Sequence, residues 1–553
     1  MATSTRNVTD NTGWPKWQIA VAVGVGALGV GTIYYLYRRN NKQKAKTCEV
    51  VENVEPKTQD PTEKAQAAKN KGNVFFKSGR FDKAIDCYTS AISVCPKENK
   101  SELATFYQNR AAAFEQLKNY AKVIEDCNNA VELNGKYTKA LFRRAKASEQ
   151  LNSLPQCLED ITAVCILEDF QNHNSLVMAD RVLKELGKQR AKEAFKNRTP
   201  VMPSQQFIKS YFSAFAEDPV FNSIKAEENE KDRDESDEVS GYEKAKQLLR
   251  GHQYEHIIDE CSAELARADS QHRPEALLLR ATFYLLLGQS DKAMKDFNEL
   301  MAIDGASDRV KTNALIKRGS LKMQQGDQDG ALSDFALAGE IDSVNSDVYH
   351  HRGQLNLLMD KCKEALSDFN MCVELKGDFP VAHVQMCYTK YRYALMTKTP
   401  HKVEEAMKDF NEVLVRFPTC AEGFALYGQA LYDQNDFGKA DDYFKKALDI
   451  EPENANVYVH RGLLMLQWKQ DIEAAAKLIN KALEIDDRCE FAYETLGTIE
   501  VQRSHMENAI SLFEKAIWLA KTEVELAHLY SLYEAAKAQQ SIARKLGIAM
   551  PSL

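Results

Sequence analysis

The sequence predicts an all-α fold in which antiparallel helix pairs stack into a superhelix, preceded by one N-terminal transmembrane helix. Three observations carry this prediction. Small and aromatic residues recur in phase, with Gly319 and Gly353 separated by 34 residues. The chain has 25 glycines and 14 prolines in 553 residues, a shortage that disfavours turn-rich β folds. One uncharged run near the N-terminus is long enough for a single membrane crossing.

Composition excludes several classes of protein. With 44% hydrophobic and 27% charged residues, the chain is neither disordered nor a polytopic membrane protein. Its formal net charge of −8 argues against a general nucleic-acid binder. Twelve cysteines are too few for a disulfide scaffold, and no C-x-x-C pair offers zinc-ribbon spacing.

The first element is the apolar run at residues 19–37, which as a helix would span about 28 Å at about 1.5 Å per residue. Two basic residues precede the run and five follow it before residue 47. The positive-inside rule therefore places the segment 1–18 across the membrane and the long C-terminal part in the cytosol, with 38–64 as a basic, polar linker. A cleaved signal peptide would instead carry its basic residues before the run.

The same run contains the pattern Gly24-x-Gly26-x-x-Gly29, which resembles a dinucleotide-binding turn. That motif has meaning only between a strand and a helix of a βαβ unit. Here the glycines lie within an apolar helix, so the nucleotide interpretation is disfavoured.

The remainder of the chain repeats a tetratricopeptide pattern of small residue, Ala, aromatic, Ala and Pro. One copy is complete at Gly428, Ala440, Phe444, Ala447 and Pro452. Further copies in phase begin at Gly72, Gly319, Gly353 and Gly497. With weaker copies, we expect about ten to eleven repeats in two arrays, three within residues 65–170 and seven or eight within residues 242–521. A final amphipathic helix at about 523–546 is expected to cap the second array, which as a domain covers 242–553.

Residues 171–241 separate the two arrays and are predicted to form a helical junction followed by an acidic linker. From Glu217 to Glu238 the chain has ten acidic and three basic residues. Such a run is usually a solvated linker, and an acidic lure for basic targeting segments is the alternative.

Five polar residues fall on the inner faces of the first three repeats. The pairs Lys69/Asn73 and Lys139/Arg143 have i, i+4 spacing, so each pair lies on one face of its helix, and Asn109 falls between them. Three cations and two amides that converge in a small cradle suit two carboxylates. A peptide with an acidic C-terminal residue presents two carboxylates close together.

These segments resemble the carboxylate clamp of chaperone-binding tetratricopeptide domains, and all five clamp positions match. The resemblance implies that the first array binds the acidic C-terminal tails of cytosolic heat-shock chaperones of the seventy- and ninety-kilodalton classes.

The order of the whole chain resembles the tetratricopeptide import receptors of the mitochondrial outer-membrane translocase. The junction at residues 197–204, followed by Phe207-Ile-Lys-Ser-Tyr-Phe212, is the most specific part of the match. The resemblance implies a single-pass outer-membrane protein with its N-terminus in the intermembrane space. It also implies other translocase subunits as partners, and a second array that binds hydrophobic preproteins such as metabolite carriers. A membrane-anchored co-chaperone or scaffold at the endoplasmic reticulum remains the alternative.

Candidate preprotein contacts in the second array are His351, Arg352, Gln354 and His460, near predicted groove positions. Arginines also precede the small residue of several repeats, and such recurrence at one phase favours a structural role over ligand binding. The recurring residues are Arg110, Arg280, Arg318, Arg352 and Arg461.

No enzyme signature accounts for the chain. The stretch from His252 to His256 matches an H-x-x-E-H zinc pattern, but it follows Gly251 at a predicted turn between paired helices. No P-loop, nucleophile elbow or kinase motif occurs. We therefore expect a non-enzymatic receptor with no cofactor, no metal and no nucleic-acid partner.

Overall fold

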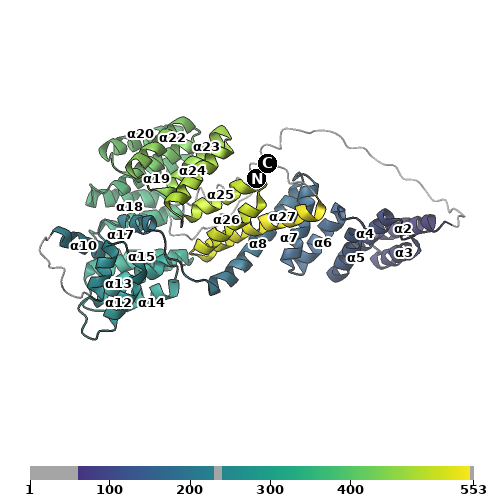
Figure 1. The fold of residues 1–553 in the computed structure, drawn as a ribbon, viewed down its shortest axis with the longest axis horizontal. Helices are drawn as coiled ribbons and strands as arrows, with labels where there is room; N and C mark the ends of the chain where they lie inside the picture. Colours follow the sequence, from purple (N-terminus) through teal and green to yellow (C-terminus); the bar gives the residue numbers. More distant parts are fainter. Residues whose placement is uncertain (1–59, 230–239, 548–553) are drawn as a thin grey trace. The chain divides into compact units, whose positions relative to one another are not determined.

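The computed structural model describes residues 60–229 and 240–547, so the predicted anchor at 19–37 lies outside the described residues. Within these ranges every regular element is a helix (Figure 1). None of these described helices is both long and apolar enough to cross a membrane. The chain divides into two compact units. The clamp unit comprises residues 60–196, 500–514 and 526–547, and the array unit comprises 197–229, 240–499 and 515–525.

The clamp unit begins with three antiparallel helix pairs, as the sequence predicts, followed by one long helix. The pairs are α2 (Pro61–Lys77) with α3 (Phe81–Val94), α4 (Lys100–Gln116) with α5 (Tyr120–Leu133), and α6 (Thr138–Gln150) with α7 (Leu154–Leu167). The long helix is α8 (His173–Asn197). Asp60 begins the series by accepting a hydrogen bond from the Thr62 backbone N–H, which satisfies one free donor of the first turn of α2.

The array unit contains seven further pairs. They are α11 (Tyr242–Arg250) with α12 (Ile257–Leu265), α13 (Arg273–Leu286) with α14 (Ser290–Met301), α15 (Asp308–Gln324) with α16 (Gln328–Ile341), α17 (Ser346–Leu358) with α18 (Cys362–Leu375), α19 (Pro380–Met396) with α20 (Pro400–Arg416), α21 (Ala421–Asp433) with α22 (Phe437–Ile450), and α23 (Ala455–Lys469) with α24 (Ile472–Ile485). Two more helices follow, α25 (Glu490–Gln502) and α26 (Met506–Leu519), and each has residues in both units.

Close contact between the two helices of a pair explains the small residues of the repeat. A Cβ atom built at Gly72 would lie 2.7 Å from Cε1 of Tyr88, the aromatic residue on the second helix. At Gly353 the corresponding Cβ would lie 3.0 Å from Cε1 of Phe369. A Cβ contact under 3.0 Å is essentially never seen, and one of 3.0–3.4 Å is uncommon. The glycines therefore allow the aromatic rings to fill the space between the helices.

The arginine that precedes the small residue has a structural role in five repeats. It forms an ion pair with an aspartate sixteen residues later, on the second helix of the same pair. The pairs are Arg110–Asp126, Arg144–Asp160, Arg280–Asp296, Arg318–Asp334 and Arg352–Asp368. Four of these arginines also donate a hydrogen bond back to the second helix of the preceding pair.

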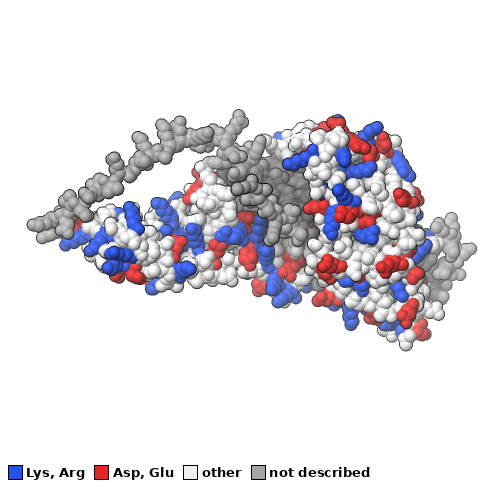
Figure 2. All heavy atoms as spheres, turned by 180° about the vertical axis from the view of Figure 1, so that it is seen from behind, with Lys and Arg blue, Asp and Glu red and all other residues white. Residues whose placement is uncertain are grey.

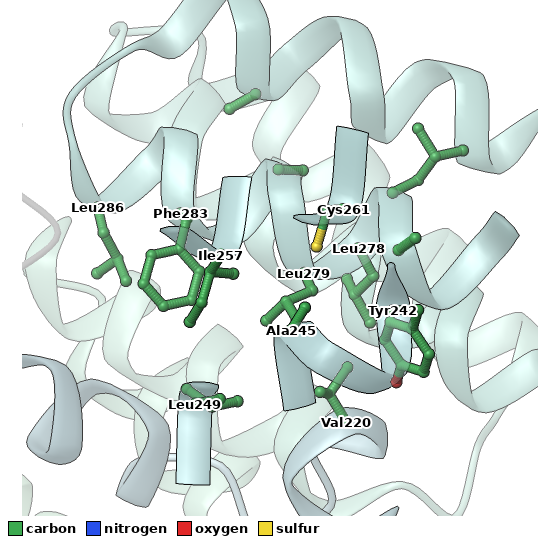
Figure 3. Packing of buried hydrophobic residues seen from close by; sticks show 14 of the residues in the cluster. Val220, Tyr242, Ala245, Leu249, Ile257, Cys261, Leu278, Leu279, Phe283 and Leu286 are labelled. Carbon is green, nitrogen blue, oxygen red and sulfur yellow. The ribbon is translucent and has the colours of Figure 1, made fainter. Parts of the chain in front are cut away.

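The acidic run is not a solvated linker throughout, and that expectation is wrong for residues 217–229. Helix α9 (Gln205–Ser213) and helix α10 (Pro219–Asn229) pack within the array unit. Val220 of α10 is 1% exposed and shares a hydrophobic cluster with Tyr242 and Leu278 of the first two pairs (Figure 3). The apolar residues that alternate with the acids fix this segment in place, and residues 230–239 lie outside the described residues.

The junction ahead of α9 is held by Arg198. Its Nη1 donates to the backbone carbonyl of Ala520 at 2.8 Å, and its Nη2 donates to that of Leu287 at 2.7 Å. One side chain therefore joins the turn between α13 and α14 to the residue after α26, all within the array unit. This contact gives a physical reason for the basic residue in the junction motif.

The last helix, α27 (Glu523–Leu546), does not belong to the second array along most of its length. From Leu526 onward it lies in the clamp unit, where Ile542 shares a hydrophobic cluster with Ile161 of α7 and Val182 of α8. The hydroxyl of Ser531 donates to the carbonyl of Leu183 at 3.1 Å. The predicted domain 242–553 is therefore too long at its C-terminal end, because the apolar face of α27 covers α7 and α8.

Candidate functional site

The five predicted clamp residues lie on the first helices of the three consecutive pairs of the clamp unit. Lys69 and Asn73 are on α2, Asn109 is on α4, and Lys139 and Arg143 are on α6. Helices α4 and α6 are in direct contact here, because Nη1 of Arg143 donates to the backbone carbonyl of Gln108 at 3.3 Å. The repeat thus places cations and amides on successive helices at fixed phase.

Three of these side chains keep their polar groups free of the rest of the chain. Within residues 60–229 and 240–547, Lys69, Asn109 and Lys139 form no side-chain hydrogen bond or ion pair. The Oδ1 atom of Asn73 accepts a 2.8 Å hydrogen bond from the Tyr88 hydroxyl, which orients the amide and leaves its N–H donors available. Unengaged donors on partly exposed or exposed side chains are suited to an external anion.

Other arginines of the same helices form ion pairs within the protein. Arg110 makes two hydrogen bonds to the carboxylate of Asp126, at 2.9 Å from Nε and 2.6 Å from Nη2. This interaction raises the pKa of Arg110. Its carboxylate partner is 3% exposed, so the pair belongs to the helix packing. Arg110 therefore differs from the clamp residues although it neighbours Asn109.

Arg143 is the exception among the clamp cations, since it already contacts one carboxylate of the chain. Its Nε donates to Oε2 of Glu115 at 2.7 Å, and the two side chains are 21% and 25% exposed. The sequence interpretation missed Glu115. The available signal was its place in the last turn of α4, where a negative charge opposes the helix dipole.

The charge of the surrounding module agrees with an anionic ligand. Residues 60–150 contain sixteen lysines and arginines and eleven acidic residues, a net charge of +5, whereas the whole chain has −8. Blue basic side chains stand out on one face of this module in Figure 2. A local positive field raises the rate at which an acidic segment is encountered.

The four candidate residues of the second array have different surroundings. The His351 ring lies 4.2 Å from the ring of Phe215, and its Nδ1 is 3.1 Å from Oε1 of Gln354. Arg352 is held by Asp368, with 2.6 Å between Nη2 and Oδ1. His460 is only 3% exposed. Burial lowers the pKa of His351 to about 4 and that of His460 to about 3, so both are neutral at pH 7.

The segment that contains α9 and α10 packs against the first helices of two repeats of the array unit, α15 and α17. The backbone N–H groups of Ala216 and Glu217 both donate to the carboxylate of Asp347, at 2.8 Å each. Nearby, Nζ of Lys317 lies 2.8 Å from Oδ2 of Asp218, and both side chains are 1% exposed. The sequence interpretation did not foresee this occupancy, because the acidic composition of 217–238 concealed its buried residues.

The zinc-like stretch forms a turn at His252 and a short 3-10 helix, η1 (Tyr254–His256). His252 has a positive φ of 59° after α11, and its Nδ1 lies 3.0 Å from the Tyr254 hydroxyl. Among the described residues, no group of three or more His, Cys, Asp or Glu side chains could hold a metal ion.

The fold and the cation-lined first helices define a tetratricopeptide-repeat binding scaffold. Tetratricopeptide-repeat family models match residues 65–98 and 274–307, and a model of the tetratricopeptide repeat protein 21 C-terminal ARM domain matches residues 369–542. The mitochondrial import receptor subunit TOM70 of Rattus norvegicus is 50% identical over 98% of this chain and 94% of its own length. The chain belongs to this TOM70 family of import receptor subunits.

One solved structure is similar to most of the chain, and another to part of it. The crystal structure of yeast Tom70 has 25% identity, covers 89% of this chain and 100% of its own, and gives a TM-score of 0.51. The first tetratricopeptide domain of Spaghetti (RPAP3), bound to the HSP90 peptide SRMEEVD, has 37% identity over 23% of this chain and 97% of its own, with a TM-score of 0.21.

Proposed function

We propose that this chain is an import receptor of the mitochondrial outer membrane that docks cytosolic heat-shock chaperones through the clamp and accepts their hydrophobic preprotein clients. Family membership supports the receptor role, since the relatives are mitochondrial import receptor subunits. The single observation that carries chaperone docking is the row of free donors from Lys69, Asn109 and Lys139 beside the guanidinium of Arg143. An acidic tail offers two carboxylates to this row.

Binding of a synthetic peptide to the full-length chain tests the docking step. The peptide SRMEEVD should bind the wild-type chain, whereas the same peptide with an amidated C-terminus should bind at least about tenfold more weakly. Fluorescence anisotropy measures both. Equal affinity for the two peptides would contradict recognition of the terminal carboxylate.

The variant Arg143→Ala tests the assignment of the clamp residues. It removes the side chain with the fixed fork of donors, so peptide binding should fall by about a hundredfold or more. Lys146→Ala is the matched control, because Lys146 is an exposed cation on the same helix whose Nζ lies over the Phe142 ring, 4.9 Å from its centroid. The control should bind the peptide within about twofold of wild type, since long-range charge alone contributes little at physiological salt.

Client binding is proposed for the array unit, with His351 and Gln354 as the candidate contacts. Arg352 and His460 would act through packing, since Arg352 is engaged by Asp368 and His460 is buried. Crosslinking of newly synthesised carrier precursors to the intact chain at isolated mitochondria tests this step. Precursors that crosslink only to the clamp unit would contradict it.

The proposed membrane arrangement has an anchor at 19–37, the N-terminus in the intermembrane space and the bulk of the chain in the cytosol, with other translocase subunits as partners. The alternative is a scaffold at the endoplasmic reticulum. Microscopy of a tagged chain distinguishes the two organelles, and protease treatment of intact mitochondria should remove the cytosolic part.

A further inference from the structure

Glu115 introduces a carboxylate of the chain itself into the carboxylate clamp. It lies in the last turn of α4, six residues after Asn109, and its Oε2 is 2.7 Å from Nε of Arg143. A negative charge at this end of a helix is electrostatically unfavourable, because the last carbonyl groups carry partial negative charge. The position is therefore not explained by the stability of α4.

Glu115 also differs from the aspartates that hold the repeat arginines. Those aspartates come from second helices, sixteen residues after their arginine, and are mostly buried; Asp160, the partner of Arg144, is 3% exposed. Glu115 comes from a first helix and is 25% exposed, and only one hydrogen bond joins it to Arg143. The Glu115–Arg143 pair is thus an open, single contact at the binding cradle.

The donors of Arg143 divide between the protein and an external ligand. A guanidinium has five N–H groups. Nε is taken by Glu115, and Nη1 donates to the carbonyl of Gln108 at 3.3 Å. Nη2 has no partner among the residues that the structure describes. A carboxylate can therefore approach through Nη2 while Glu115 stays in place.

We propose that Glu115 is a positioning residue that holds Arg143 by its Nε and whose negative charge limits how tightly the clamp binds an acidic tail. This inference rests on the proposed docking of such tails. With Glu115 included, three cations and one anion leave a net charge of +2, which matches the two carboxylates of an acidic C-terminal residue. Without that anion the cradle would retain longer acidic segments and other polyanions more strongly.

Two substitutions separate the position of Arg143 from the charge beside it. Glu115→Gln keeps an acceptor for Nε and removes the negative charge, so the full-length chain should bind SRMEEVD about fivefold more tightly, with a steeper loss of affinity as salt rises. Glu115→Ala removes charge and acceptor together, so its affinity should fall about threefold or more below that of Glu115→Gln. Glu132→Gln, at an exposed acid of the neighbouring helix α5, is the matched control and should bind within about twofold of wild type.

The background Arg143→Lys distinguishes positioning from a general structural effect. A lysine side chain has no planar guanidinium whose Nε–H group an acceptor could hold in one orientation. In this background Glu115→Gln and Glu115→Ala should therefore bind SRMEEVD with equal affinity. Thermal unfolding of each variant verifies that the chain is folded.

The outcomes distinguish the two proposals. A wild-type chain that does not bind SRMEEVD overturns the docking function and this inference with it. If wild type binds and Glu115→Gln is no tighter, the limiting role of the charge is overturned while docking stands. If Glu115→Ala binds as well as Glu115→Gln, or if the two still differ in the Arg143→Lys background, the positioning role is overturned.

Discussion

Two cationic side chains at the same position of the repeat differ in their exposure to solvent. Arg143 on α6 and Lys317 on α15 each stand two residues before the small residue that packs on the second helix, Ala145 and Gly319. The Arg143 side chain is 21% exposed, whereas that of Lys317 is 1% exposed. Lys317 also donates to the Thr282 hydroxyl at 3.1 Å. The repeat determines where such a side chain lies, and the presence of another segment above it determines whether it is buried.

The groups around Lys317 explain why its side chain is buried. Its ammonium group lies 5.0 Å from the ring centroid of Phe215 and 5.5 Å from that of Phe212, both in or next to α9. In residues 204–229 the chain thus supplies aromatic faces and the carboxylate of Asp218 to its own cation. Lys139 of the clamp unit is exposed instead, and its side chain forms no hydrogen bond or ion pair with the residues that the structure describes.

The largest expected effect concerns stability in the array unit. Lys317→Met removes one partner of a buried pair and leaves Asp218 uncompensated, so the free energy of unfolding should fall by about 3–5 kcal/mol. Chemical denaturation measures this loss. Binding of SRMEEVD to the folded variant should not change, because Lys317 belongs to the other unit.

A paired substitution checks the cause of that loss. Lys317→Met combined with Asp218→Asn should recover part of the lost stability, since no isolated charge remains buried. A double variant as unstable as the sum of two independent losses would contradict an ion-pair origin.

A smaller effect, dependent on pH, is expected at His460. Burial lowers its pKa in the folded chain to about 3, below the value near 6.5 for an unfolded histidine. Between these values the unfolded chain binds the additional proton, so stability falls as pH falls, by about 1.4 kcal/mol per unit for this group. His460→Gln should show a shallower loss of stability between pH 6 and pH 4 than wild type, measured by denaturation at each pH. Parallel pH profiles would show that His460 is not buried in its neutral form.

The smallest expected change in stability is at the clamp itself. Arg143→Ala breaks a partly exposed contact with Glu115, and such pairs contribute about 0–1 kcal/mol. Its unfolding free energy should therefore stay within that range of wild type, although peptide binding is lost. A loss comparable to that of Lys317→Met would remove the distinction between the two cations.

Sequence periodicity predicted the helix pairs because the small and aromatic residues that mark them contact each other within a repeat, as Gly72 and Tyr88 do. It also predicted that the five clamp residues lie on the first helices of three consecutive pairs. It failed where contacts join segments far apart in the chain. The contacts of Asp218 with Lys317 and of Ser531 with Leu183 span 99 and 348 residues. Neither has a periodic signal, and so the packing of α10 and α27 could not be foreseen.

The candidates of the second array were predicted from their place near the groove, but the position of a residue in the repeat does not reveal whether it is buried. His351 and His460 both stand two residues before a glycine, as Arg143 does before Ala145. His351 meets Phe215 from the junction, and His460 stacks at 9° on the ring of Phe444, 6.0 Å between centroids. These contacts depend on the size of neighbouring side chains and on the packing of the junction segment. An alignment of the repeats contains neither kind of information.

The arginines that precede the small residues give the repeats a direction. Arg110 reaches back to Thr89 of α3, Arg144 to Asn128 of α5, and Arg318 to Asn298 of α14, and each also binds an aspartate on the helix that follows it. As the ribosome releases the chain from its N-terminus, each new first helix meets a preceding partner that has already been made. Its arginine can bind that partner at once and then hold the next helix when it emerges. The polypeptide is thus suited to assembly in the order of its own synthesis.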